Sequence, residues 1–341
     1  MGPRVRTHLY VPQGLFLSGC RKKMNKTSLS LTLGVLFSVV LLVGVTVVYP
    51  NIDDLWVENP FWNGLSTFYT MYKPVRMSDY SQLEGVYNPG NSTLFIIGPY
   101  REFTEMERFS LVGYLARGGS LVLADDFGTG NKMLESLGLS VRFDTGLLRD
   151  PIFREKNSHM PRATTNLVGL GFIVLNYPTV LSGVNSGAVS VWSSPLSYIS
   201  VDGDPSVFDS YPIMARFSFS DGRVTVLSDS SVFINSMLDK GDNLELLKSL
   251  ARGTIIIDEA HSAQSRLGTV KSFLTKTYNY LGFYEIRYAL LLVTVMGVLR
   301  MNLSITEKPV DPVEDLLRRH PEYDRTKVEW LQEERRKAYG K

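Results

Sequence analysis

The fold is decided by LFIIGPYREFTEMERFSLVGYLARGGSLVLADD, which spans residues 94–126. It begins with a short apolar run, Leu94–Ile97, typical of a buried strand. Apolar residues then recur near helical spacing over Thr104–Arg117, with glutamates in the first turn, and Gly118-Gly119 ends that pattern. A second apolar run, Ser120–Ala124, follows at once. We therefore predict a strand, a helix and a parallel strand joined by short loops.

The same alternation continues toward the C-terminus and predicts an α/β fold. The expected elements are a helix at Lys132–Leu137, strands at Ser140–Phe143, Ile213–Phe219 and Arg223–Leu227, a hairpin turn at Asp221-Gly222, a helix at Asn243–Ala251, and a strand at Thr254–Ile257. Residues 144–212 are instead rich in Ser, Gly, Pro and Asn, and we interpret them as a β-rich insertion. The pattern predicts a mostly parallel sheet covered by helices on both faces.

Polar residues gather directly after three of the predicted strands. Ligands of open α/β sheets bind outside the carboxyl ends of the strands, so these residues are candidates for one binding crevice. They are Asp125, Asp126, Thr129, Asn131, Asp229, Ser230, Ser231, Asn235, Asp258, Glu259 and His261. Such side chains suit a divalent metal or a polar ligand. The alternative is that they only cap turns and helices after the strands.

Motifs for enzymatic activity are incomplete. Residues 255–261 read IIIDEAH, a pattern like Walker B and DEAH, but the chain has no G-x-x-x-x-G-K-[ST] loop to cradle phosphates. Ser230 and Ser231 lack the G-x-S-x-G elbow of a serine hydrolase. The one cysteine is Cys20, so residues 51–283 offer no Cys nucleophile. These features point away from catalysis, and we predict no cofactor other than the divalent metal considered above.

The N-terminal region predicts a membrane anchor. Residues 29–49 form a dense apolar run without charge, and the basic segment 1–28 places its leading end in the cytoplasm by the positive-inside rule. A cleaved signal peptide is the alternative, although no small-residue cleavage site follows the run. Met24 offers a second start, because residues 1–23 differ in character from the rest of the chain.

A second transmembrane helix is predicted at residues 284–300. The two spans would place residues 51–283 outside the cytoplasm at the cell membrane, with both termini inside. That body carries 24 acidic and 19 basic side chains, a balance that argues against a nucleic-acid partner. The cytoplasmic tail, 301–341, is dense in mixed charge, with helices expected at Pro312–Arg319 and Asp324–Ala338. We interpret it as either a solvated tail or a docking surface for a protein partner.

Several of these motifs together resemble the domain of unknown function 4350 family. They are Phe95–Pro99, Tyr114–Asp125, Val226–Asp229 with Phe233–Asn235, and Asp258–His261. The family is similar to glutamine-amidotransferase-like domains found also in gliding-associated ABC transport components. The resemblance implies a flavodoxin-like three-layer sandwich of the class I glutamine-amidotransferase type, membrane anchors at one or both ends, and a genomic neighbourhood with MoxR-type ATPases. Amidotransferases of that class use a nucleophilic Cys, which residues 51–283 lack.

Two kinds of function fit these observations. The first is a membrane-anchored, non-catalytic amidotransferase-like module that binds a ligand or partner, as part of a transport-linked or MoxR-ATPase-linked system. A subunit of that kind would co-purify with an ATPase. The second is an exported metal-assisted hydrolase, in which the Asp, Glu and His side chains named above converge on one metal ion.

Overall fold

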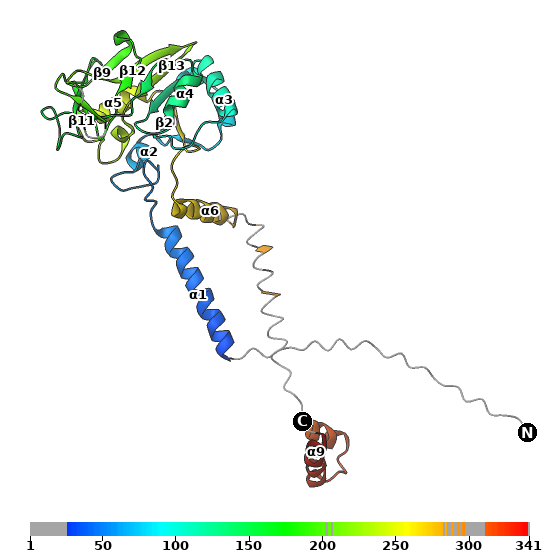
Figure 1. Ribbon diagram of the computed structural model, residues 1–341. Coiled ribbons are helices and arrows are strands. Elements are labelled where there is room, and N and C mark those ends of the chain that lie inside the picture. The colour runs from blue at the N-terminus through cyan, green and yellow to red at the C-terminus, as the bar shows by residue number, and fades with distance from the viewer. Residues whose placement is uncertain are drawn as a thin grey trace, which may run out of the picture. The chain divides into compact units, whose positions relative to one another are not determined.

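The structure is a computed structural model. It describes residues 26–201, 204–205, 207–281, 284, 288–289, 292, 295–296 and 311–339. The chain divides into two compact units, Met1–Ser272 and Phe273–Lys341. The first unit holds the α/β domain, and the second holds the tail helices (Figure 1).

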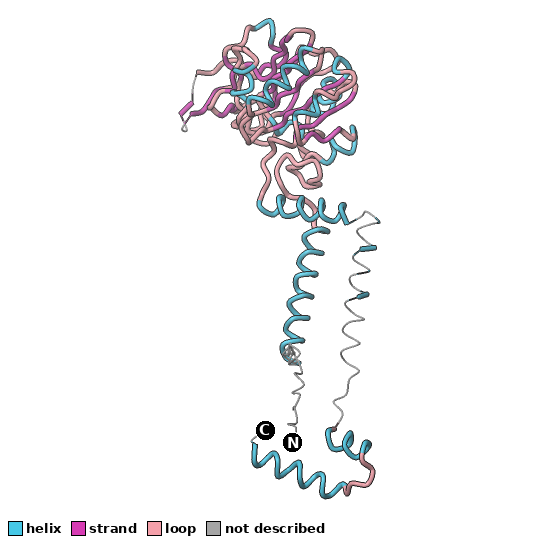
Figure 2. The backbone as a smooth tube through the Cα atoms, turned by 90° about the vertical axis from the view of Figure 1, so that its right-hand side faces the viewer, coloured by secondary structure: helices cyan, strands magenta, loops and turns pink. Residues whose placement is uncertain are grey.

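Within the described residues, the core of the first unit is a sheet of nine strands (Figure 2). In spatial order the strands are β1 (Val75–Met77), β14 (Thr254–Asp258), β2 (Ser92–Ile97), β3 (Ser120–Ala124), β13 (Gly222–Leu227), β12 (Pro212–Phe219), β9 (Val189–Trp192), β6 (Arg162–Thr165) and β7 (Phe172–Val174). The first five strands pair in parallel. The last four extend the sheet through antiparallel pairs.

The inner parallel strands, β14, β2, β3 and β13, are largely buried on both faces because helices cover each side. Helices α3 (Glu105–Ala116) and α4 (Gly130–Ser136) pack on one face. Helices α2 (Ser66–Tyr72) and α5 (Asn243–Leu250) pack on the other. Alternate residues of each strand therefore enter two separate apolar cores, as the unbroken apolar runs of the sequence require.

Helix α3 begins where the sequence predicts, because its first turn is capped reciprocally. The Thr104 hydroxyl accepts a hydrogen bond from the Glu107 backbone N–H, while the Glu107 carboxylate accepts one from the Thr104 N–H at 2.7 Å. This capping box satisfies two donors that would otherwise have no partner inside the helix.

Two features of the predicted sheet are corrected by the structure. The sheet is not mostly parallel, since four of its strand pairs are antiparallel. The strand expected at Ser140–Phe143 shortens to β4 (Arg142–Phe143), leaves the main sheet and pairs with β8 (Leu181–Ser182). Its place next to β3 is taken by β13, which begins at Gly222, far along the chain from Arg142, and supplies a longer apolar strand.

Residues 144–212, predicted as a β-rich insertion, contribute to more than one sheet. Their strands β6, β7 and β9 join the main sheet, whereas β5 (Leu147–Arg149), β10 (Tyr198–Val201) and β11 (Asp204–Pro205) form a small sheet of their own. Short 3-10 helices complete the unit: η1 (Tyr80–Leu83), η2 (Pro89–Asn91), η3 (Ser186–Ala188) and η4 (Ser230–Phe233).

The predicted hairpin is confirmed, but its turn lies one residue before the predicted position, Asp221-Gly222. Phe219 pairs with Gly222, so the two-residue turn is Ser220-Asp221, with Ser220 at a φ of 50°. Gly222 itself lies in β13, where a Cβ atom would stand 2.4 Å from the Leu115 carbonyl oxygen. The glycine is therefore needed for close backbone approach and not for the turn.

The predicted flanking transmembrane helices are not supported. Residues Lys26–Val48 form helix α1 and Arg266–Leu281 form helix α6. No helix in the described part of the chain is long and apolar enough to cross a membrane, which takes about 20 predominantly apolar residues. Helix α6 has 16 residues, and most of the predicted span 284–300 lies outside the described residues. The extracytoplasmic location was inferred from these spans and stays a prediction.

The second unit contains the two helices expected in the tail. Helix α8 (Pro312–Arg319) begins after Asp311, whose carboxylate accepts a hydrogen bond from the Val313 N–H at 3.1 Å. Helix α9 (Arg325–Tyr339) follows Asp324, which caps it in the same way. Both aspartates are therefore N-caps, as their positions predict.

Candidate functional site

The carboxyl ends of β3 and β13 bring part of the predicted site together. The two strands are parallel neighbours, so the residues that follow them meet at one edge of the sheet. The Ser230 hydroxyl donates a hydrogen bond to the Asp126 carboxylate at 3.2 Å. Asp125, Asp126, Asp229 and Ser230 form a group that we call the carboxylate cluster.

Asp125 holds the loop after β3 in place. Its Oδ1 accepts hydrogen bonds from the backbone N–H groups of Asp126 and Gly128, both at 2.9 Å, and its Oδ2 accepts one from Gly130 at 2.7 Å. The side chain is buried, and burial raises its pKa to about 6, although the backbone hydrogen bonds oppose the shift. Both of its oxygens are thus engaged by the loop.

Asp229 plays the matching role after β13. Its two oxygens accept hydrogen bonds from the backbone N–H groups of Asn176, at 2.6 Å, and Ser231, at 2.8 Å. It is completely buried, and burial together with the nearby Asp126 charge raises its pKa well above the ordinary value. Asp126 is only half-buried, and burial also raises its pKa. Of the three carboxylates, Asp126 alone presents an oxygen to solvent and to a hydroxyl.

The residues after β14 form a second group, the histidine cluster. The His261 Nδ1 lies 2.9 Å from the Asp258 carboxylate, and its Nε2 lies 3.5 Å from that of Glu107. The imidazole stacks on Phe103, with ring centroids 3.7 Å apart, and meets Tyr80 edge-on. Only 2% of His261 is exposed. Both ring nitrogens therefore face carboxylates inside an aromatic enclosure.

The pKa values of two neighbours of His261, Glu107 and Tyr80, shift in opposite directions. Burial opposes ionisation of Glu107, but hydrogen bonds from Thr104 and the charge of His261 outweigh it and lower the Glu107 pKa. Burial, reinforced by the Asp258 and Glu107 charges, raises the pKa of Tyr80 well above its usual value. The cluster thus favours the neutral phenol of Tyr80 beside the ionised form of Glu107.

The remaining predicted residues hold local structure. The Thr129 hydroxyl donates to the Pro99 and Arg101 carbonyls. Asn131 exchanges two hydrogen bonds with the Phe143 backbone. Asn235 donates to the Asn59 and Phe61 carbonyls and accepts from Thr67. The Ser231 backbone N–H donates to the Asp229 carboxylate, and Glu259 forms an ion pair with Arg76 at 2.6 Å.

The two clusters are separate because of strand order. Strand β2 lies between β14 and β3, and β13 lies one strand further. The carboxylate cluster, at the ends of β3 and β13, is therefore two to three strand spacings from β14, or roughly 10–14 Å. The residues Tyr80, Phe103 and Glu107 of the histidine cluster were missed by sequence reasoning. The S/T-x-x-E signal at Thr104–Glu107 marks a helix start, and nothing local to it indicates that the same glutamate reaches an imidazole after β14.

A cleft of ≈ 750 Å³ lies beside the histidine cluster, within the first unit. Tyr100 and Arg101, which follow β2, line one part of it, and Gln264 and Asp53 line another. Asp53 is buried, and its Oδ2 has no hydrogen-bond partner in the described part of the chain. The volume falls in the range of small-molecule sites. The cleft therefore offers the side chains of two exposed residues, the Asp54 carboxylate and the Arg101 guanidinium, to a small polar ligand.

A shared metal site does not emerge from the described residues. Among them, no three His, Cys, Asp or Glu side chains are placed so that they could hold a metal ion together. The divalent metal, and the hydrolase built on it, stay predictions.

The raised pKa of Asp125 predicts a pH-dependent stability. A carboxyl whose pKa rises from 3.8 to about 6 on folding stabilises the domain below pH 4, and this stabilisation is lost as pH rises to 6. The shift is worth ~3 kcal/mol of unfolding free energy, an order-of-magnitude figure. The stability difference between wild type and Asp125→Asn should therefore fall over this pH window in urea unfolding. Asp221→Asn, at an exposed turn position, is the control, and an unchanged difference across the window would contradict the prediction.

The fold and the polar loops at one edge of the sheet define a mixed α/β domain with its candidate groups at the strand ends. Sequence comparison then gives the family. The model of the Domain of unknown function (DUF4350) matches residues 57–251, and the chain belongs to this family. Comparison with curated proteins finds no match.

Similar solved structures are distant. The mmIFT52 N-terminal domain is 18% identical, with 50% of this chain and 77% of that chain covered and a TM-score of 0.39. A putative ThuA-like protein from Bacteroides uniformis ATCC 8492 is 15% identical, with 51% and 73% covered and a TM-score of 0.31. Similarity at this level identifies neither a function nor a ligand.

Proposed function

We propose that the α/β domain is a non-catalytic, amidotransferase-like module that binds a small polar ligand at the carboxyl edge of its sheet. One observation carries the proposal. The groups that would perform acid–base or nucleophilic chemistry are already engaged, since both nitrogens of His261 face carboxylates and the oxygens of Asp125 and Asp229 hold backbone N–H groups. A general base needs a free nitrogen or oxygen within reach of the proton that it removes.

The cleft beside the histidine cluster supplies the binding part of the proposal. It combines the carboxylate side chain of Asp54 with the guanidinium side chain of Arg101, and both residues are exposed. A ligand with an ammonium and a carboxylate group, such as a free amino acid, complements this pair of charges. The family's resemblance to amidotransferase-like domains makes L-glutamine the natural probe.

Binding without turnover is tested with the full chain and millimolar L-glutamine. We expect a higher melting temperature, because a ligand that binds only the folded state stabilises it, and no ammonia release above the buffer rate. Arg101→Ala should abolish the shift. The Arg101 backbone N–H and carbonyl, which bond to His261 and Thr129, are untouched by this change. Arg154→Ala, at an exposed position, should keep the shift.

Either of two outcomes would overturn part of the proposal. Ammonia release that scales with the concentration of the chain would show that the domain is catalytic. If L-glutamine does not change the melting temperature, or if it still raises the melting temperature of Arg101→Ala, the cleft is not its binding site.

The tail supports a role in assembly. Its two helices and the loop between them leave several large apolar side chains exposed on the second unit, namely Leu316, Tyr323, Trp330 and Leu331. Exposed Trp and Tyr are enriched where proteins bind one another. We propose that this surface docks a protein partner, and an ATPase of a transport-linked or MoxR-type system is the partner class that the family resemblance suggests.

A further inference from the structure

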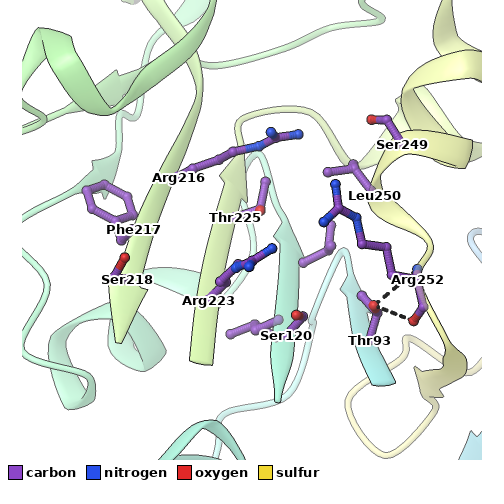
Figure 3. Close-up of a pocket in the computed structure, with 12 residues that line it drawn as sticks. Thr93, Ser120, Arg216, Phe217, Ser218, Arg223, Thr225, Ser249, Leu250 and Arg252 are labelled. Atoms are coloured by element: carbon purple, nitrogen blue, oxygen red, sulfur yellow. Dashed lines mark hydrogen bonds between the residues drawn. The ribbon is translucent and has the colours of Figure 1, made fainter. Parts of the chain in front are cut away.

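A second cleft lies at the opposite edge of the sheet, at the amino ends of β2, β3 and β13. Thr93 and Ser120, near the starts of β2 and β3, line it, and its volume is ≈ 170 Å³. Three arginines from different elements reach it: Arg216 from β12, Arg223 from β13 and Arg252 from the loop after α5 (Figure 3). We call this feature the arginine cleft.

The charge of the arginine cleft is not neutralised by the chain. No Asp or Glu lines it, and in the described part of the chain none of its three arginines forms an ion pair with a carboxylate. Other arginines of the domain, Arg76 and Arg162 among them, do have such partners. The carboxyl end of α5 offers only the partial charge of a helix terminus, about half an elementary charge. A net positive charge of about two and a half therefore remains.

The positive charges are held close enough to affect one another. Arg216 is half-buried, and burial together with the charges of Arg252 and Arg223 lowers its pKa. Like charges repel, so gathering them without an anion costs stability. An arrangement of this kind is expected where an anion completes the site.

The backbone that carries the arginines is well fixed. Arg216 and Arg223 lie on the two strands of the hairpin, paired with Thr225 and Ser218. The Thr93 hydroxyl donates to the Arg252 carbonyl at 2.9 Å and accepts from its N–H at 3.3 Å. Ser120 and Ser218 also line the cleft and carry hydroxyl donors, whereas the Ser249 hydroxyl donates to the Leu246 carbonyl at 2.8 Å. Arginine forks and hydroxyls suit the geometry of a tetrahedral oxyanion.

We propose that the arginine cleft binds a phosphoryl group, either as free phosphate or as the terminal group of a small phosphate ester. The small volume favours such a ligand, because drug-sized molecules occupy about 300 Å³ or more. The site is distinct from the carboxyl-edge cleft, since it lies at the other ends of the same parallel strands.

The test uses the full chain and inorganic phosphate, with KCl at matched ionic strength as the control for charge screening. Phosphate should raise the melting temperature more than KCl does. Arg223→Gln and Arg252→Gln should each weaken phosphate binding about tenfold or more, as expected for the loss of charge-assisted hydrogen bonds. Each variant should also melt higher than wild type at low salt without phosphate, because repulsion is relieved. Arg154→Gln should match wild type throughout.

The outcomes distinguish specific anion binding from charge screening, and free phosphate from a phosphate ester. A larger effect of glycerol 3-phosphate than of phosphate would identify a small ester as the ligand, and the reverse would identify free phosphate. Equal effects of phosphate and KCl would overturn the proposal, because they would show general screening only. Phosphate binding that survives both arginine substitutions would overturn it as well.

Discussion

Replacing Gly253 by alanine is expected to cost the domain roughly 3–5 kcal/mol of unfolding free energy. Gly253 has a φ of 63° and turns the chain from α5 into β14. A Cβ atom at this position would stand 1.9 Å from the Asn91 carbonyl oxygen, which belongs to the backbone and cannot rotate away. The variant must therefore accommodate both the left-handed conformation and a displacement of the segment that leads into β2.

The matched control for this prediction is Gly138→Ala. Gly138 has nearly the same φ, 67°, at the end of α4, but no atom lies within 4 Å of the position that a Cβ atom would take there. This variant should lose only the conformational term, about 1–2 kcal/mol. Urea unfolding of the two variants separates the cost of the left-handed backbone from the cost of the steric clash with Asn91. Equal losses of unfolding free energy would show that the clash does not contribute.

Replacing Asp229 by alanine is expected to cost about 3–5 kcal/mol near pH 5, since the backbone N–H groups of Asn176 and Ser231 would lose their buried acceptor. The loss should shrink as pH rises. Burial raises the pKa of Asp229, so its stabilising contribution is full below the unfolded pKa and is lost as pH climbs toward the folded pKa.

Asp229→Asn distinguishes these two effects. The amide keeps one acceptor oxygen and cannot ionise, so this variant should lose less than Asp229→Ala near pH 5 and should remove the pH dependence that Asp229 contributes. Guanidinium unfolding at several pH values measures both the loss of unfolding free energy and its dependence on pH. A loss in Asp229→Ala that stays constant with pH would contradict the assignment of a raised pKa.

Local patterns in the sequence predicted the parallel elements well. The observed bounds of β3 equal the predicted ones, and those of α3 differ by one residue at each end, because apolar spacing, the Thr104 cap and Gly118-Gly119 all act locally. Strand pairing is not local. Residues 140–143 have strand-like character, yet β13 takes the position beside β3, and no pattern near Ser140 contains that information.

The same limit applies to the candidate site. Sequence order predicted polar loops after three strands, and the structure places polar residues there. Whether they meet depends on which strands are neighbours. Asp126 and Ser230 come together because β3 and β13 are adjacent. His261 follows β14, which is not adjacent to either strand, and it lies beside Glu107 instead. The arginine cleft escaped sequence reasoning because Arg216, Arg223 and Arg252 form no motif along the chain.

The position of β14 in the sheet has a practical consequence for anyone who divides this protein. The family match ends at residue 251, but β14 lies between β1 and β2 and pairs with both. A recombinant fragment trimmed to that match would detach β1 and leave the interior strand β2 with a bare row of backbone donors and acceptors, which invites intermolecular association. The smallest autonomous piece of this domain must therefore extend past Asp258, so the boundary of sequence similarity is not the boundary of the folding unit.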